Sequence, residues 1–236
     1  MEDPAMAADV ELLFLHALPF DGSMWDAQRS DLAIASHAPT LYGHGDDLVA
    51  WAAAALACAR GSRLVVVGCS VGGSCALELA RLAPDRVAAL VLIGTKAEHN
   101  PDPALRDSAL ALLDGGLLEE AWGRFWQPLF APGASSAIVE RARQGAMNRH
   151  SADLARGVSA FHARRSRADT LASFPGPVLV VTGEHDTAPG IATSERQAAM
   201  ARNGTLHVIP GSGHYVPLER PDAMTALLSD LLASLG

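Results

Sequence analysis

Short apolar runs alternate with longer amphipathic stretches along most of the chain. Apolar runs bounded by turn residues are typical of buried strands, and we expect six of them, at 10–15, 39–41, 64–67, 87–93, 177–182 and 205–209. Apolar residues recur at helical spacing in the stretches between them, at 25–35, 48–60, 74–83, 191–202 and 221–235. This alternation is typical of right-handed βαβ units. The sequence therefore predicts an α/β fold with one sheet of about six parallel strands flanked by helices.

The alternation stops after the fourth predicted strand. From residue 96 to residue 166 only helical patterns occur, at 103–114, 117–130, 135–149 and 151–165. Ser23 and Ser151 are expected to cap the helices that follow them. Ligand sites in open α/β sheets lie at the carboxyl edge of the strands. We therefore expect residues 1–95 and 167–236 to form a core domain and residues 96–166 a four-helix cap, or lid, over that edge, although a helical extension packed elsewhere would give the same pattern.

Composition excludes several classes of function. Acidic residues outnumber basic ones, giving a formal charge of -8, which argues against a nucleic-acid partner. No apolar run approaches the ~20 residues of a membrane span, and the acidic N-terminus lacks the pattern of a signal peptide. Cys58, Cys69 and Cys75 show no paired spacing, as expected for a reduced cytoplasmic protein.

The strongest chemical signal follows the third predicted strand. Residues 68–72 read Gly-Cys-Ser-Val-Gly, and a helical pattern begins directly afterwards. A Gly-x-Ser-x-Gly turn between a strand and a helix is typical of a nucleophile elbow, in which small neighbours let the chain turn sharply beneath an exposed serine. Ser70 is thus the candidate nucleophile, unless the turn arises by chance. Cys69 lies one residue from the apex and is expected to point into the core.

A serine nucleophile needs a base and an acid at the same sheet edge. Asp186 follows the fifth predicted strand and His214 follows the sixth, which gives the chain order Ser, Asp, His of α/β-hydrolases. Asp186 could instead cap the next helix, in which case Glu98 or Glu184 would be the acid. No metal is expected, since His185 has no second ligand at metal-binding spacing.

Four features together make the chain similar to the α/β-hydrolase superfamily, which includes small carboxylesterases, 3-oxoadipate enol-lactonases and C–C bond hydrolases. Besides the elbow, residues 16–18 resemble the family's oxyanion turn, residues 39–45 its Gly-x-Gly stretch and residues 213–214 its catalytic histidine loop. The resemblance covers nearly the whole chain. It implies an oxyanion hole made of the backbone N–H groups of Leu18 and Val71. Pro19 has no N–H and cannot contribute.

This resemblance implies a serine hydrolase that cleaves a small carboxylic ester or lactone without a cofactor. An enol-lactonase, a C–C bond hydrolase or a ligand-binding module with little turnover would fit the same motifs. Members usually carry a β-hairpin before the first parallel strand. Only nine residues precede Val10, so we expect the hairpin to be missing. The sheet edge that the hairpin would cover could then be covered by a loop or by a homodimer contact.

Aromatic and basic residues suggest how substrate is held. The expected pocket residues are His16, Trp25, Trp122, Trp126 and Phe130. Core packing is the alternative for the aromatic side chains, and hydrogen bonding within the turn is the alternative for His16. Arginine is also dense near the end of the predicted cap, at 141, 143, 149, 156, 164, 165 and 167. Such residues usually form a solvated face, but one turned inward would bind a substrate carboxylate.

Overall fold

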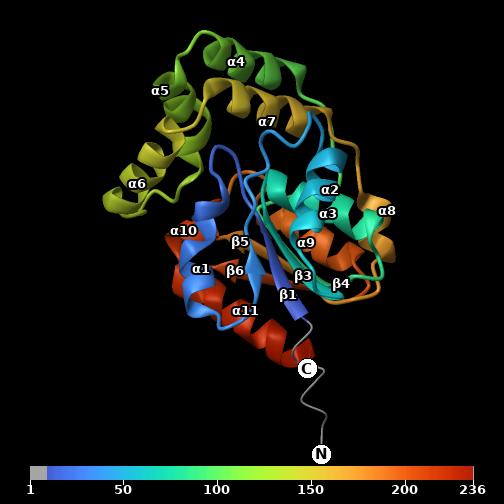
Figure 1. Ribbon diagram of the computed structural model, residues 1–236. Coiled ribbons are helices and arrows are strands. Elements are labelled where there is room, and N and C mark those ends of the chain that lie inside the picture. Colours follow the sequence, from blue (N-terminus) through green and yellow to red (C-terminus); the bar gives the residue numbers. More distant parts are fainter. Residues whose placement is uncertain (1–9, 236) are drawn as a thin grey trace, which may run out of the picture.

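The computed structural model describes residues 10–235 and contains a single sheet of six parallel strands (Figure 1). The strands are β1 (Val10–Leu15), β2 (Ser36–His37), β3 (Arg63–Cys69), β4 (Val87–Ile93), β5 (Val178–Gly183) and β6 (Gly204–Ile209). Their order across the sheet is β2-β1-β3-β4-β5-β6, and every neighbouring pair is parallel. The predicted α/β-hydrolase architecture is confirmed.

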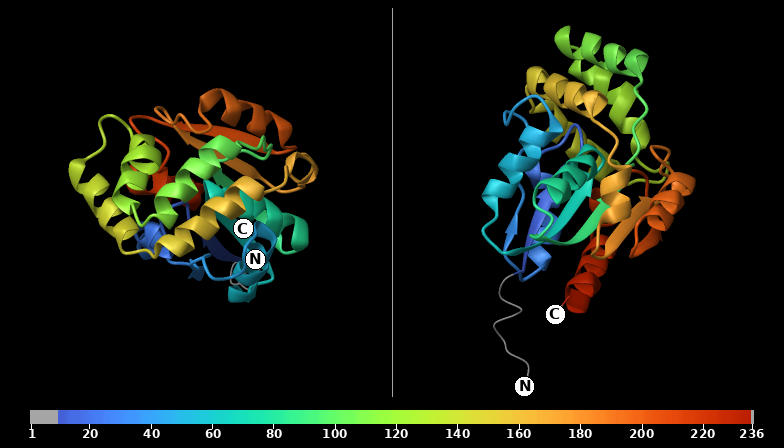
Figure 2. Two further views of the ribbon diagram at one scale, coloured as in Figure 1. Left: turned by 90° about the horizontal axis from the view of Figure 1, so that it is seen from above. Right: turned by 90° about the vertical axis from the view of Figure 1, so that its right-hand side faces the viewer.

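Helices pack on both faces of this sheet (Figures 1 and 2). The 3-10 turn η2 (Gly22–Trp25) leads into α1 (Asp26–Asp31), which packs against α11 (Pro221–Leu235). The other layer consists of α2 (Leu48–Cys58), α3 (Val71–Leu82), α8 (Ala168–Ser173) and α9 (Ile191–Met200). A short helix, α10 (Val216–Glu219), joins the loop after β6 to α11. Covered on both faces, the central strands are almost wholly buried and apolar, as parallel sheets require.

The segment between β4 and β5 forms a separate group of helices beyond the carboxyl ends of the strands (Figure 1). Its elements are α4 (Pro103–Asp114), α5 (Leu118–Ala121), the π-helical turn η3 (Trp122–Trp126), the 3-10 turn η4 (Gln127–Leu129), α6 (Ser136–Met147) and α7 (Ser151–Ala163). The chain leaves and re-enters the core at one point, where the Arg167 N–H donates to the Ala97 carbonyl at 2.8 Å. Buried Gln197 holds the same point, because its side chain bonds both the Ala97 N–H and the Thr95 carbonyl.

Some predicted boundaries are wrong for identifiable reasons. The second strand lies at Ser36–His37 and not at 39–41, because the Leu41 N–H donates to His16 Nε2 at 2.9 Å and not to a neighbouring strand. The helix predicted at 117–130 is divided into α5, η3 and η4, and Pro128 lies in the last turn.

The two predicted serine caps are also wrong. Asp21 caps η2 by accepting from the Ser23 N–H, so Ser23 lies one position inside the turn. Ser151 is the first residue of α7, and His150 occupies the cap position without a side-chain hydrogen bond.

Two expectations concern the ends of the chain and the membrane. The missing N-terminal hairpin concerns residues 1–9, which lie outside the described residues. Within residues 10–235, every helix is too short or too polar to cross a bilayer.

Candidate active site

Ser70 sits at a strained turn between β3 and α3. Its backbone has φ 55° and ψ -118°, and among residues 10–235 it is the one non-glycine residue with positive φ. A Cβ on Gly68 would overlap the Gly72 carbonyl, and a Cβ on Gly72 would overlap the Leu15 carbonyl. The turn therefore needs glycine on both sides of Ser70 and packs directly against the end of β1. This is the geometry of a nucleophile elbow.

Asp186 and His214 meet at the same edge of the sheet. The His214 Nδ1 lies 3.1 Å from Asp186 Oδ1, and both side chains are buried. The Asp186 carboxylate also accepts from the Thr182 hydroxyl at 3.2 Å and the Ala188 N–H at 2.8 Å. Burial acts to raise the pKa of Asp186, but the adjacent His214 imidazole and these two donors outweigh it and hold the pKa below its usual value. Asp186 is therefore suited to remain ionised beside the histidine.

Gly94, which the sequence analysis did not single out, makes room for this pair. It follows β4 with φ 53°, and a Cβ there would lie 2.8 Å from His214 Nδ1 and 3.2 Å from Asp186 Oδ2. A side chain would therefore displace the imidazole. The sequence feature that could have indicated this role is a glycine directly after a predicted central strand.

The histidine loop is held by a second residue that the sequence analysis missed. The buried Glu219 carboxylate, in α10, accepts from the N–H groups of Gly213, Tyr215 and Ala131 at 2.9–3.2 Å. The His214 N–H donates to the Leu129 carbonyl at 2.8 Å. These bonds fix the loop on both sides of His214 and attach it to the inserted helices. No sequence motif marks Glu219, because its partners lie as far as 88 positions away.

Of the two expected oxyanion donors, Val71 follows Ser70 directly and Leu18 lines the same cavity. Val71 is the first residue of α3, so its N–H has no acceptor within the helix. Leu18 lines the same cavity as Ser70 and His214, and its carbonyl accepts from the Tyr215 hydroxyl at 3.1 Å. The turn after β1 and the loop after β6 are therefore tied together at this edge.

A cavity of about 580 Å³ separates these residues from the inserted helices. Ser70 and His214 contribute to its floor, and Trp126, Phe125 and Phe161 to its walls. Its other apolar lining residues are Leu18, Leu105, Ala109, Pro128, Leu129, Val158, Ala188 and Pro189. This is the volume of an ordinary small-molecule site.

Of the five expected pocket residues, Trp126 lines this cavity and the other four do not. Trp25 is fully buried and stacks on Phe14, with ring centroids 4.9 Å apart. Trp122 and Phe130 are buried and pack against each other, with ring centroids 6.0 Å apart. These three rings belong to the core.

His16 is also buried away from the cavity. Its Nε2 accepts from the Leu41 N–H and its Nδ1 lies 3.1 Å from the Ala17 carbonyl. Burial lowers the pKa of His16 to about 4, so the ring is neutral and supports the turn.

The alternative acids and nucleophile lie elsewhere. Glu184 is exposed and accepts from the Gly211 N–H at 2.9 Å, and Glu98 is exposed beside Arg196 on the rim of a different cavity. Cys69 is fully buried, and burial raises the pKa of its thiol well above the usual value. Within the described part of the chain, no group of three or more His, Cys, Asp or Glu side chains could hold a metal ion.

Comparison with known proteins agrees with this geometry. The sequence profile of the alpha/beta hydrolase family matches residues 12–227. The putative carbamate hydrolase RutD of Caulobacter sp. is 31% identical over 82% of this chain and 73% of its own length. A thermophilic esterase from Thermogutta terrifontis, solved with malate bound, superposes with a TM-score of 0.84 at 25% identity, over 96% of this chain and 90% of that one. The enol-lactonase of Burkholderia xenovorans LB400 has the same fold, with a TM-score of 0.82 at 19% identity over 98% and 94% of the two chains. The chain belongs to the alpha/beta hydrolase family.

Proposed function

We propose that this protein is a serine hydrolase that cleaves small carboxylic esters or lactones through an acyl-enzyme on Ser70. The observation that carries the proposal is the buried Asp186–His214 hydrogen bond, together with the fact that His214 and the strained Ser70 line the same cavity. The esterase similarity supports an ester substrate. This chemistry needs only groups of the protein and water, so no cofactor is invoked.

In this mechanism His214 is the general base and Asp186 orients it. The Asp186 carboxylate holds Nδ1–H, which leaves Nε2 free to take the Ser70 proton as Oγ attacks the carbonyl carbon. When the tetrahedral intermediate collapses, the proton passes to the leaving alcohol and the acyl group stays on Oγ. His214 then takes a proton from water, the hydroxide attacks the acyl carbon, and the acid leaves as Ser70 regains its proton.

The oxyanion of each intermediate would be held by the N–H groups of Leu18 and Val71. The Val71 N–H is at the start of the 12-residue helix α3, where the helix dipole favours negative charge. Each such donor is typically worth ~100- to 1000-fold in rate. Residues 96–166 would act as the cap domain, because their helices supply much of the lining of the cavity and would shield the reacting groups from water.

Replacing Ser70 tests this proposal. Hydrolysis of p-nitrophenyl butyrate should fall at least ~1000-fold in Ser70→Ala, because the nucleophile is lost. Cys69→Ala is the matched control, since Cys69 is adjacent but faces the core, and it should keep most of the activity. Labelling with a fluorophosphonate should modify the peptide that contains Ser70. Equal losses in the two variants, or a label elsewhere, would contradict the proposed nucleophile.

A further inference from the structure

Arg164 is a buried cation without an acidic partner. It follows α7, lines the active-site cavity and is only 8% exposed. Its guanidinium lies over the Phe161 ring at 3.7 Å and donates to the Phe161 carbonyl. Within residues 10–235, no Asp or Glu side chain pairs with it. Burial alone lowers its pKa to about 10, so the group is charged at neutral pH and its charge is not compensated.

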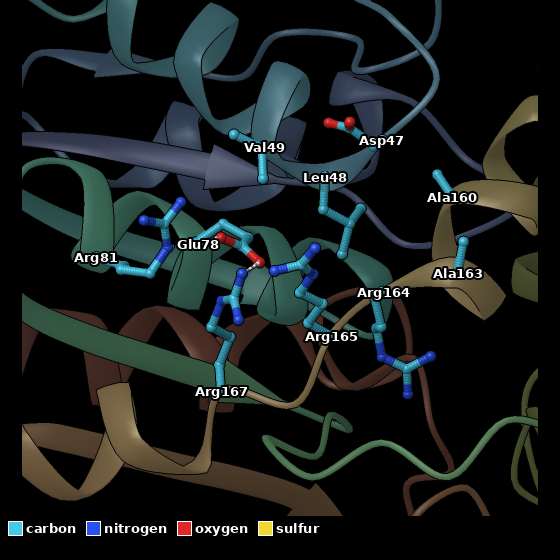
Figure 3. Close-up of a pocket in the computed structure, with 10 residues that line it drawn as sticks. All are labelled: Asp47, Leu48, Val49, Glu78, Arg81, Ala160, Ala163, Arg164, Arg165 and Arg167. Carbon is cyan, nitrogen blue, oxygen red and sulfur yellow. Dashed lines mark hydrogen bonds and ion pairs between the residues drawn. The ribbon is translucent and has the colours of Figure 1, made fainter.

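Neighbouring arginines behave differently. A second cavity, of about 570 Å³, lies on the other side of Arg164 between α2, α3 and the end of α7 (Figure 3). There Arg81 and Arg167 pair with the buried Glu78 carboxylate, at 3.1 and 2.7 Å. Figure 3 shows Arg165 and Arg167 pointing toward Glu78, whereas the guanidinium of Arg164 turns away from it. Arg164 is therefore not part of this structural ion-pair cluster.

The active-site cavity itself has a strongly positive lining. Lys96 and Arg124 line it together with Arg164, and His162 adds a polar ring. Among the described residues that line this cavity, none is Asp or Glu, although acidic residues exceed basic ones in the chain as a whole. A cavity with three cations and no acid in an acidic protein attracts anionic ligands.

A buried, uncompensated charge is unfavourable unless a ligand supplies the opposite charge. We propose that Arg164 binds a carboxylate of the substrate, so that the ester or lactone cleaved at Ser70 carries a free carboxylate group. The planar guanidinium fork matches a carboxylate in a bidentate arrangement. Of the three cations that line the cavity, Arg164 alone is buried, and a single buried monocation suits a carboxylate better than a dianionic phosphate. This inference rests on the proposed function and adds the substrate class to it.

The other lining residues of the cavity indicate the chemistry of the substrate between its carboxylate and its scissile carbonyl. Phe125, Trp126 and Leu129 present apolar surface to the cavity, as do Ala109 and Val158. A substrate with a short apolar chain between its carboxylate and its scissile carbonyl would match both the apolar lining and the buried cation.

Two substrates of equal chain length test the charge preference. The p-nitrophenyl monoester of glutaric acid carries a carboxylate, and p-nitrophenyl valerate does not. The wild-type protein should have a kcat/KM at least ~10-fold higher for the charged ester. Arg164→Gln should reduce this preference by ~10- to 100-fold, mainly through KM. Arg165→Gln is the matched control, because it removes the same charge from the adjacent residue, which faces the other cavity.

A binding measurement keeps the test independent of turnover. Glutarate should raise the thermal midpoint of the wild-type protein and of Arg165→Gln but not that of Arg164→Gln. A second pair of esters, 4-carboxyphenyl valerate and phenyl valerate, shows whether the carboxylate belongs to the alcohol part. Equal kcat/KM values within both pairs of esters would overturn the carboxylate site while leaving the hydrolase proposal intact. Absence of Ser70-dependent cleavage of every ester would instead overturn the proposed function.

Discussion

At the scale of single residues, His16 links the turn after β1 to the segment after β2. The Leu41 N–H donates to its Nε2, so the ring must carry its proton on Nδ1, toward the Ala17 carbonyl. Protonating Nε2 would break the bond to Leu41 and place a charge in the core. For this reason the group resists protonation in the folded protein, where its pKa is about 4 against the usual 6.5.

This shift predicts a pH dependence of stability. Below about pH 6.5 the unfolded chain binds a proton at His16 that the folded chain binds only near pH 4, so the free energy of unfolding falls as the pH falls through this range. His16 contributes about 3 kcal/mol to the free energy of unfolding. This contribution is fully present above about pH 6.5 and is lost by about pH 4.

Replacing His16 with Gln isolates the effect, since the Gln side-chain oxygen can accept from Leu41 but does not titrate. Urea unfolding between about pH 7.5 and about pH 4.5 should show a flatter pH dependence in His16→Gln than in the wild type. The exposed His44, changed to Gln, is the control and should leave the slope as it is. Parallel slopes for the wild type and His16→Gln would show that His16 titrates alike in both states.

Residues that a contiguous sequence pattern identifies could be predicted from the sequence. Ser70 could be proposed because strand, glycine turn and helix are contiguous, and Asp186 and His214 because each follows a predicted strand. Gly94 and Glu219 could not, because their roles depend on contacts between segments far apart in the sequence. The same holds for Trp25, whose burial depends on packing that no local pattern specifies.

At the scale of elements, the short helix α10 sets the position of the histidine loop. Its Glu219 carboxylate accepts N–H groups on both sides of His214 and one from Ala131, just after η4. Helices this short contain too few residues to show a hydrophobic period, so α8 and α10 were not predicted from the sequence. The longer elements α4 and β4 were predicted with the bounds that the structure gives them.

Glu219→Gln should therefore impair the site through the loop. The Gln amide group would face backbone N–H donors, leaving one of them without an acceptor at a cost of about 1–3 kcal/mol in the free energy of unfolding. With His214 displaced, kcat for p-nitrophenyl butyrate should fall ~10-fold or more while KM changes little. Glu184→Gln is the control, because that exposed carboxylate accepts a single N–H in the same loop. A loss of stability with unchanged kcat would restrict Glu219 to a structural role.

At the scale of the whole molecule, the inserted helices are attached to the core at separate points. Near α8, the Arg167–Glu78 ion pair and the Arg167–Ala97 backbone bond close the ends of the insertion. Near η4, the Leu129 carbonyl accepts from the His214 N–H. Beyond α6, Arg149 pairs at 2.7 Å with Asp21, which lies in the loop between β1 and η2. The Arg149–Asp21 pair is more exposed than the Arg167–Glu78 pair, so solvent screens it more strongly.

Removing this ion pair should free α6 without unfolding the core. In Arg149→Met, amide hydrogen exchange across Ser136–Met147 should accelerate several-fold while exchange in β3 stays as in the wild type, because local opening costs less once the anchor is lost. Arg143→Met is the matched control, since Arg143 lies in α6 itself but pairs with Glu119 and Glu140 within the insertion. KM for p-nitrophenyl butyrate should rise in Arg149→Met, as the roof of the cavity loosens. Equal exchange in the two variants would show that apolar packing, and not the Asp21 contact, holds α6 against the core.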